Sequence, residues 1–206
     1  MLLALIVTQK DTILPCVILK GPEELVGSWD ELAHFLASLP EEDRARASSY
    51  GALRLPDDVE GIVAVLSAYA AENPSVTPSA LLATTGARAG ASGDLDLART
   101  LGHAALDLAE GPKDIQLAHV SLAQAYFQNR RDEANLASFV EHCRAAIEAG
   151  HAGSFCYERL ATLYEYRSEK EEAVEICHRA IEVLEAAGDT RSVARFRKRL
   201  DRLSRK

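Results

Sequence analysis

Aromatic and sulphur-containing side chains are scarce in this chain of 206 residues. Phe, Trp and Tyr make up 6% of it, and Trp and Met occur once each. So few rings argue against a large pocket lined by aromatic side chains. The four cysteines form no C-x-x-C pair and have no zinc-like spacing to a histidine, so we expect reduced thiols and a cytoplasmic protein. These cysteines are Cys16, Cys143, Cys156 and Cys177.

Long apolar runs and an excess of positive charge are also missing. No stretch approaches the roughly 18 apolar residues of a membrane span. The apolar start, residues 1–7, has no basic segment and no small-residue cleavage site, and we expect it to form a strand instead of a targeting signal. The net charge of −8 argues against a protein that coats nucleic acid.

Motifs of catalytic or cofactor chemistry are absent as well. The sequence contains no G-x-S-x-G, no H-E-x-x-H, no phosphate-binding glycine loop and no dinucleotide-binding fingerprint. We therefore expect no catalytic residue, no metal site and no cofactor, and a protein that is not an enzyme.

Alanine is abundant, and the second half of the chain repeats itself. The 34 alanines favour closely packed helices. Residues 141–148 match residues 175–182 at five of eight positions, at a shift of 34 residues. Upstream, Leu122-Ala123-x-x-Tyr126 matches Leu160-Ala161-x-x-Tyr164 at a shift of 38. The difference indicates a four-residue insertion around residues 130–138.

This pattern resembles the tetratricopeptide repeat, a pair of helices in 34 residues with small side chains where the helices meet and large ones between them. Three copies start near Ser79, near Gln116 and at Ser154, and the resemblance covers residues 79–187. The matching positions are Leu82, Gly86, Ala98 and Ala105 in the first copy, Leu122, Ala123, Tyr126, Cys143 and Ala146 in the second, and Tyr157, Leu160, Ala161, Tyr164, Ala173, Cys177 and Ala180 in the third. Cys143 and Cys177 share a repeat position that faces the partner helix, so we expect both thiols to be buried.

The expected fold is mainly α-helical, with a helical solenoid of about three repeats over residues 77–188. Residues 189–206 are basic, and their apolar positions predict an amphipathic helix that caps the last repeat and turns its arginines outward. These positions are Val193, Phe196, Leu200 and Leu203. Residues 1–76 resemble no family. There we expect a small α/β unit with a β-hairpin over residues 1–20, a helix from Ser28, a helical turn with a loop over residues 41–55, and a helix after Asp58.

The resemblance implies a non-enzymatic adaptor that binds a peptide or helix of a partner protein in a concave groove. The implied groove is apolar, aromatic and mildly acidic, and its residues in the second and third copies are Leu117, Val120, Gln124, Phe127, Gln128, Phe155, Glu158, Arg159, Thr162, Glu165 and Tyr166. In the first copy they are Ala80, Ala83, Ala87, Gly90 and Ala91. Relatives that grip the C-terminal carboxylate of chaperones use Lys and Asn at positions that hold other residues here, so we expect no such clamp.

Other functions stay open at this point. An unpaired edge of the N-terminal hairpin would suit a homodimer or another assembly role. We expect the arginines of the basic C-terminal helix to pair with the acidic remainder of the chain, and the alternative is a surface that binds nucleic acid or an acidic partner. An enzyme would need a site in residues 1–75, where no motif indicates one.

Overall fold

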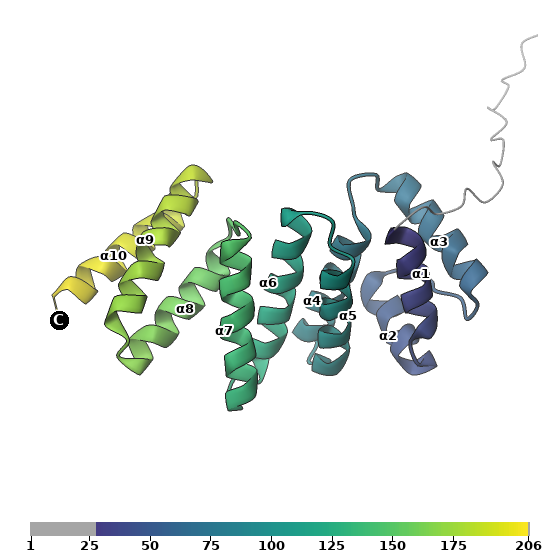
Figure 1. Cartoon of the computed structure of the whole chain (residues 1–206), viewed down its shortest axis with the longest axis horizontal. Coiled ribbons are helices and arrows are strands. Elements are labelled where there is room, and N and C mark those ends of the chain that lie inside the picture. Colours follow the sequence, from purple (N-terminus) through teal and green to yellow (C-terminus); the bar gives the residue numbers. More distant parts are fainter. Residues whose placement is uncertain (1–27, 206) are drawn as a thin grey trace, which may run out of the picture.

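The computed structural model describes residues 28–205, and within that range the chain forms ten helices and no strand (Figure 1). The predicted β-hairpin over residues 1–20 lies outside the described residues. The helices are α1 (Ser28–Ser38), α2 (Glu41–Gly51), α3 (Val59–Glu72), α4 (Pro78–Ala91), α5 (Leu95–Asp107), α6 (Pro112–Gln128), α7 (Glu133–Glu148), α8 (Ser154–Arg167), α9 (Lys170–Ala186) and α10 (Thr190–Ser204).

The first three helices make up the described part of the unit expected before residue 77, and no strand occurs in that part. Helices α1 and α3 begin where the capping residues predict, and the Asp58 carboxylate accepts a hydrogen bond of 2.7 Å from the backbone N–H of Gly61. The prediction of a helical turn and a loop after residue 40 is wrong, because α2 has eleven residues. This helix buries only Ala47 and has little apolar periodicity. It packs on α4, and Arg46 forms an ion pair of 3.0 Å with Asp94.

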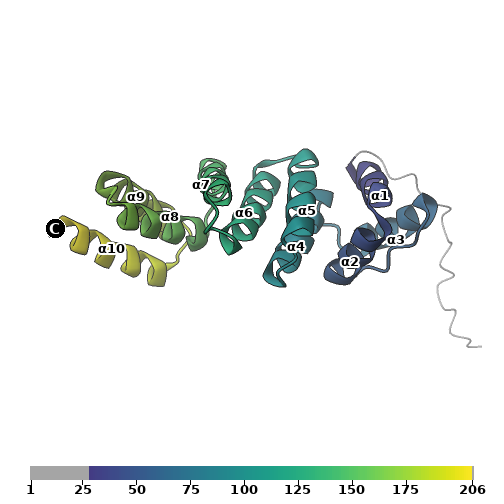
Figure 2. The ribbon, with the colours of Figure 1, turned by 90° about the horizontal axis from the view of Figure 1, so that it is seen from below.

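The following six helices form three successive hairpins, α4/α5, α6/α7 and α8/α9, which lie in a row (Figures 1 and 2). This arrangement is consistent with a helical solenoid. The small residues that the repeat pattern places at close helix contacts are buried there. Ala98, Ala105, Ala123, Ala146, Ala161, Ala173 and Ala180 are each 0% exposed.

The four-residue insertion of the middle repeat is divided between a loop and a helix. The loop between α6 and α7, residues 129–132, is longer than the two-residue link between α8 and α9. Helix α7 also begins ten residues before Cys143, whereas α9 begins seven residues before Cys177. The inserted residues therefore add Arg130 and Arg131 to the loop and extend the start of α7.

Helix α10 ends the row and lies against α9 (Figure 2). Val193, Phe196 and Leu203 are buried, and Leu200 is half-buried, which confirms the predicted apolar face. Arg195, Arg199 and Arg202 of this helix reach carboxylates of α8, as expected for a basic face that pairs with the acidic part of the chain. No helix between Ser28 and Arg205 combines the length and the apolar character needed to cross a lipid bilayer.

Candidate functional site

A cleft of about 800 Å³ opens between the end of α6, the start of α7 and the middle of α8. A second hollow of about 460 Å³ shares Phe127, Gln128 and Arg159 with it and reaches α4. We call the two together the α6–α8 cleft. Its residues are Ala87, Gly90, Ala91, Gln124, Phe127, Gln128, Asn129, Arg130, Arg131, Leu136, Phe139, Phe155, Arg159, Thr162, Leu163 and Tyr166.

Aromatic side chains fill the space between the second and third hairpins. The backbones of α4 and α6 pack closely, whereas those of α6 and α8 do not. Phe139 occupies the repeat position that is Ala98 in the first hairpin and Ala173 in the third, and it is buried. The centre of the Phe127 ring lies 5.1 Å from that of Phe139 and 6.4 Å from that of Phe155. Between α6 and α8, large aromatic rings therefore take the place of the close backbone packing seen between α4 and α6. The cleft lies beside these rings.

Two guanidinium groups lie over the Phe127 ring at the edge of the cleft. The guanidinium carbon of Arg130 is 4.2 Å from the ring centre, and that of Arg159 is 4.6 Å from it. Both distances fall in the range of cation–π interactions. Arg130 also donates a hydrogen bond of 3.0 Å to the carbonyl of Phe127, which satisfies one of the free carbonyls at the end of α6.

These arginines carry positive charge that the described part of the chain does not neutralise. Arg130, Arg131 and Arg159 are exposed. No carboxylate of residues 28–205 lies within the 4.0 Å that defines an ion pair with any of them. The cleft is therefore basic on a chain whose net charge is −8.

Most of the eleven residues predicted for the groove lie together in the α6–α8 cleft. Seven of them line it: Gln124, Phe127, Gln128, Phe155, Arg159, Thr162 and Tyr166. Tyr166 is 88% exposed, whereas the Phe127 and Phe155 rings are half-buried. Leu117 and Val120 lie nearer the start of α6 and do not line the cleft, and Leu117 is 39% exposed.

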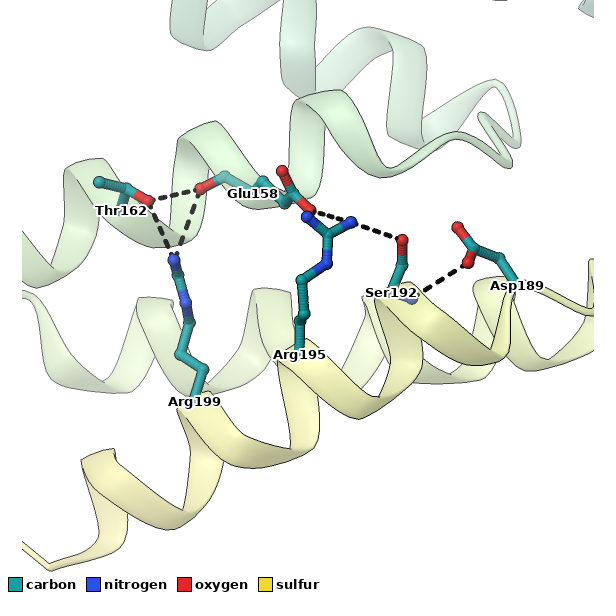
Figure 3. Close-up of polar contacts among 6 residues, drawn as sticks. All are labelled: Glu158, Thr162, Asp189, Ser192, Arg195 and Arg199. Carbon is teal, nitrogen blue, oxygen red and sulfur yellow. Dashed lines mark hydrogen bonds and ion pairs between the residues drawn. The ribbon is translucent and has the colours of Figure 1, made fainter.

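The two acidic residues predicted for the groove contact α10. Arg195 forms an ion pair of 2.7 Å with Glu158 (Figure 3). Arg199 forms an ion pair of 3.2 Å with Glu165. Arg202 also pairs with Glu165. Arg199 donates hydrogen bonds of 3.1 and 3.2 Å to the Thr162 hydroxyl.

These contacts change the charge of the groove. The expected acidic character depended on Glu158 and Glu165, whose charges are balanced by α10. The arginines that remain in the cleft come mainly from the loop after α6. Sequence reasoning missed Arg130 and Arg131, but it found the insertion that contains them. Insertions in repeat proteins map to loops on one face, which is often the binding face.

A second polar cluster, which we call the histidine cluster, lies on α5, α6 and α7. The Nδ1 atoms of His119 and His142 are 3.0 Å apart, and the rings of His142 and Tyr126 are stacked with centres 5.4 Å apart. His103 Nε2 lies 3.3 Å from the Tyr126 hydroxyl. Burial lowers the pKa of His142 to about 4, and the nearby His119 and His103 contribute in the same direction. Burial also lowers the pKa of His119.

The cluster therefore belongs to the packing between the hairpins, and it is not arranged as a metal centre. Between Ser28 and Arg205, no group of three or more His, Cys, Asp or Glu residues could hold a metal ion. The cysteines of that range are free and buried, as predicted for Cys143 and Cys177, while Cys16 lies outside it. Burial raises the pKa of the Cys143 thiol, and it raises the pKa of the Cys177 thiol to about 11.

Comparison of the sequence with protein-family models, with curated proteins and with solved structures finds no significant match. The resemblance to the tetratricopeptide repeat gains no support from these comparisons and stays a prediction. The fold and the cleft are therefore the only basis for a functional proposal.

Proposed function

We propose that this chain is a non-enzymatic adaptor, similar to tetratricopeptide-repeat proteins, that binds a peptide or helix of a partner protein in the α6–α8 cleft. The observation that carries the proposal is the cleft itself. Its two adjoining hollows bring together an exposed Tyr166, the half-buried rings of Phe127 and Phe155, and guanidinium groups without an ion-pair partner in residues 28–205, and each hollow has a size that ligands occupy. Aromatic and arginine side chains supply most of the binding energy at protein interfaces.

The neighbouring hairpin supports the same use of the cleft. The part of α4 that borders it carries only the small residues Ala87, Gly90 and Ala91. Small side chains leave room for the backbone of a bound segment, while the rings beside them offer apolar contact. Three buried free thiols within residues 28–205 suit a reducing compartment, and we place the protein in the cytoplasm on that ground.

Affinity capture from a cell lysate tests the proposal when two matched variants accompany the wild type. The cleft variant is Gln128→Ala/Tyr166→Ala, and both residues are exposed, so the fold should survive. The control is Val59→Ala/Ile115→Ala, which removes apolar side chains of 38% and 36% exposure outside the cleft. We expect specific proteins to be lost with the cleft variant only and to bind the wild type directly once purified. Equal capture by all three proteins would refute the proposal.

A further inference from the structure

The chemistry of the bound segment follows from the arginines of the α6–α8 cleft, if the function proposed above is right. When a guanidinium stacks on an aromatic ring, its N–H groups point sideways in the guanidinium plane. They can then donate hydrogen bonds to a carboxylate of a ligand that lies beside the ring. Arg159 donates no hydrogen bond within residues 28–205 that would use these groups. The Phe127 ring supports the side chains of both Arg159 and Arg130, so less conformational entropy is lost when they bind.

We infer that the α6–α8 cleft binds an acidic segment of a partner protein, with Asp or Glu side chains held by Arg130 and Arg159. Arg131 adds positive charge from the same loop. An apolar side chain next to the bound carboxylate would pack on Tyr166 and Leu163, which line the same hollow. The cleft stands out from its surroundings because the chain as a whole is acidic, and because Arg195, Arg199 and Arg202 of α10 are already paired with carboxylates of α8.

The same side chains favour a peptide over a single strand of nucleic acid. A strand without sequence preference binds through bases that stack on free aromatic faces beside a basic groove. Here the guanidinium groups of Arg130 and Arg159 lie over the Phe127 ring, where a base would stack. The Phe155 ring is half-buried against its neighbours, which leaves Tyr166 as the only well-exposed ring of the cleft.

Selection from a random peptide library on the full chain tests the inference. Displayed peptides of about 12 residues are selected and then synthesised with amidated C-termini, so that side chains supply the only carboxylates. Binding is measured by fluorescence anisotropy at low and high salt, beside a single-stranded oligothymidylate. The variants are Arg130→Gln/Arg159→Gln in the cleft and Lys198→Gln/Arg205→Gln, which removes the same charge from exposed positions of α10 and its C-cap. A third variant, Arg159→Glu, reverses one charge.

We expect the selected peptides to be rich in Asp and Glu with an apolar neighbour, and their binding to weaken at high salt. The cleft variant should lose at least about 10-fold in affinity, the control should lose little, and Arg159→Glu should select basic peptides instead. Neutral or basic peptides that require Tyr166 on the wild type would overturn the acidic preference and leave the proposed function standing.

The remaining outcomes also decide the question. Peptides that bind equally well to every cleft variant, including Gln128→Ala/Tyr166→Ala, would refute the proposed function together with this inference. If oligothymidylate binds more tightly than any selected peptide, and if its binding requires Arg130 and Arg159, the ligand of the cleft is nucleic acid and the inference of an acidic peptide is wrong. Self-association of the wild type that Arg130→Gln/Arg159→Gln abolishes in light scattering would make a second copy of the chain the occupant.

Discussion

The single residue with the clearest electrostatic constraint is His142. A hydrogen bond between the Nδ1 atoms of His119 and His142 requires one ring to donate a proton and the other to accept it. Two charged rings at this distance would both present a donor. His142 is only 7% exposed, so it remains neutral well below the pH at which a free histidine ionises. Glu141, on the same helix as His142, opposes the effect of burial on the pKa of His119. The Arg99 guanidinium lies 4.9 Å from the centre of the Tyr126 ring, which stacks on His142.

This constraint predicts that acid destabilises the fold through His142. The pKa of His142 is about 4 in the folded chain and about 6.5 in the unfolded chain. Between these values the unfolded state binds a proton that the folded state does not, so stability is full above about pH 6.5 and falls as the pH is lowered toward 4. The loss should reach about 3 kcal/mol, at about 1.4 kcal/mol for each pH unit. Urea unfolding at a series of pH values from 7.5 to 4.5 measures it.

His142→Gln and His34→Gln separate this effect from general acid sensitivity. His142→Gln should be less stable at neutral pH but should lose less stability as the pH falls. His34, on α1, has a side chain that is 65% exposed, so its replacement should leave the wild-type slope unchanged. A wild type whose stability does not change between pH 6.5 and 4.5 would contradict the neutral, buried state of His142.

At the scale of elements, one turn ends five of the helices. In each, a residue with positive φ follows the helix, and the next backbone N–H bonds to a carbonyl five residues earlier. The five N–H to carbonyl pairs are Leu53 to Ser48, Asp94 to Ala89, His151 to Ala146, Glu169 to Tyr164 and Asp189 to Leu184, at 2.9 to 3.1 Å. Glycine supplies the positive φ in three turns, whereas Ala52 supplies it after α2 with a φ of 55° and Ser168 supplies it after α8 with a φ of 62°.

We predict that Ser168→Gly stabilises the chain. A residue with a Cβ is disfavoured in this conformation by about 1–2 kcal/mol. Glycine avoids this cost, but it also has more conformational entropy in the unfolded state, which offsets part of the gain. The net gain should be about 0.5–1 kcal/mol in the free energy of unfolding, measured with urea. Gly188→Ala is the matched change in the turn before α10. Nothing lies within 4 Å of the Cβ it would add, so its cost of about 1 kcal/mol comes from the backbone alone.

We expect Ser168→Gly to raise the free energy of unfolding and Gly188→Ala to lower it. If Ser168→Gly destabilised the chain instead, the side chain of Ser168 would have a stabilising contact that outweighs its backbone conformation.

The elements that sequence reasoning identified are those with a clear apolar period. Helices α8 and α9 could be predicted closely, because Leu160, Ala161, Ala173 and Ala180 recur at repeat positions and are all buried. Helix α2 could not, because its sequence has almost no apolar stripe and its contacts are polar. Arg46 pairs with Asp94, which lies 48 residues away, and such distant pairs leave no periodic signal.

At the scale of the whole molecule, the charge of the cleft also depends on pairs of residues that are distant in the sequence. The repeat positions predicted that Phe127, Phe155, Arg159 and Tyr166 would meet, because a repeat fixes which residues share one face. Whether a groove is acidic or basic depends on which charges are paired. Here that is decided by α10, whose arginines contact α8 from about 37 residues away in the sequence. The uneven charge of the chain predicted that the basic helix would attract acidic residues, but local patterns carry no information about which carboxylates it would reach.

Helix α10 also closes the core at the end of the row, and we predict that its apolar face contributes most of its stabilisation. Phe196 is 1% exposed, and Phe196→Ala should cost about 3–5 kcal/mol through a cavity against α9. Replacing Arg195, Arg199 and Arg202 by Gln should cost less, about 1–2 kcal/mol in all. Exposed ion pairs contribute under about 1 kcal/mol each, and Arg199 with Glu165 is the more buried pair. Thermal and urea unfolding of the two variants compares the costs.

The arginine variant should change binding more than it changes stability. Without these arginines, Glu158 and Glu165 keep their negative charge on α8, and Thr162 between them lines the α6–α8 cleft. An acidic peptide selected on the wild type should therefore bind this variant several-fold more weakly at low salt, with the difference reduced at high salt. Phe196→Ala, measured under conditions where it stays folded, is the control and should bind as the wild type does. If the arginine variant unfolds more readily than Phe196→Ala, the capping role assigned to the apolar face is wrong, because ion pairs would then hold α10 in place.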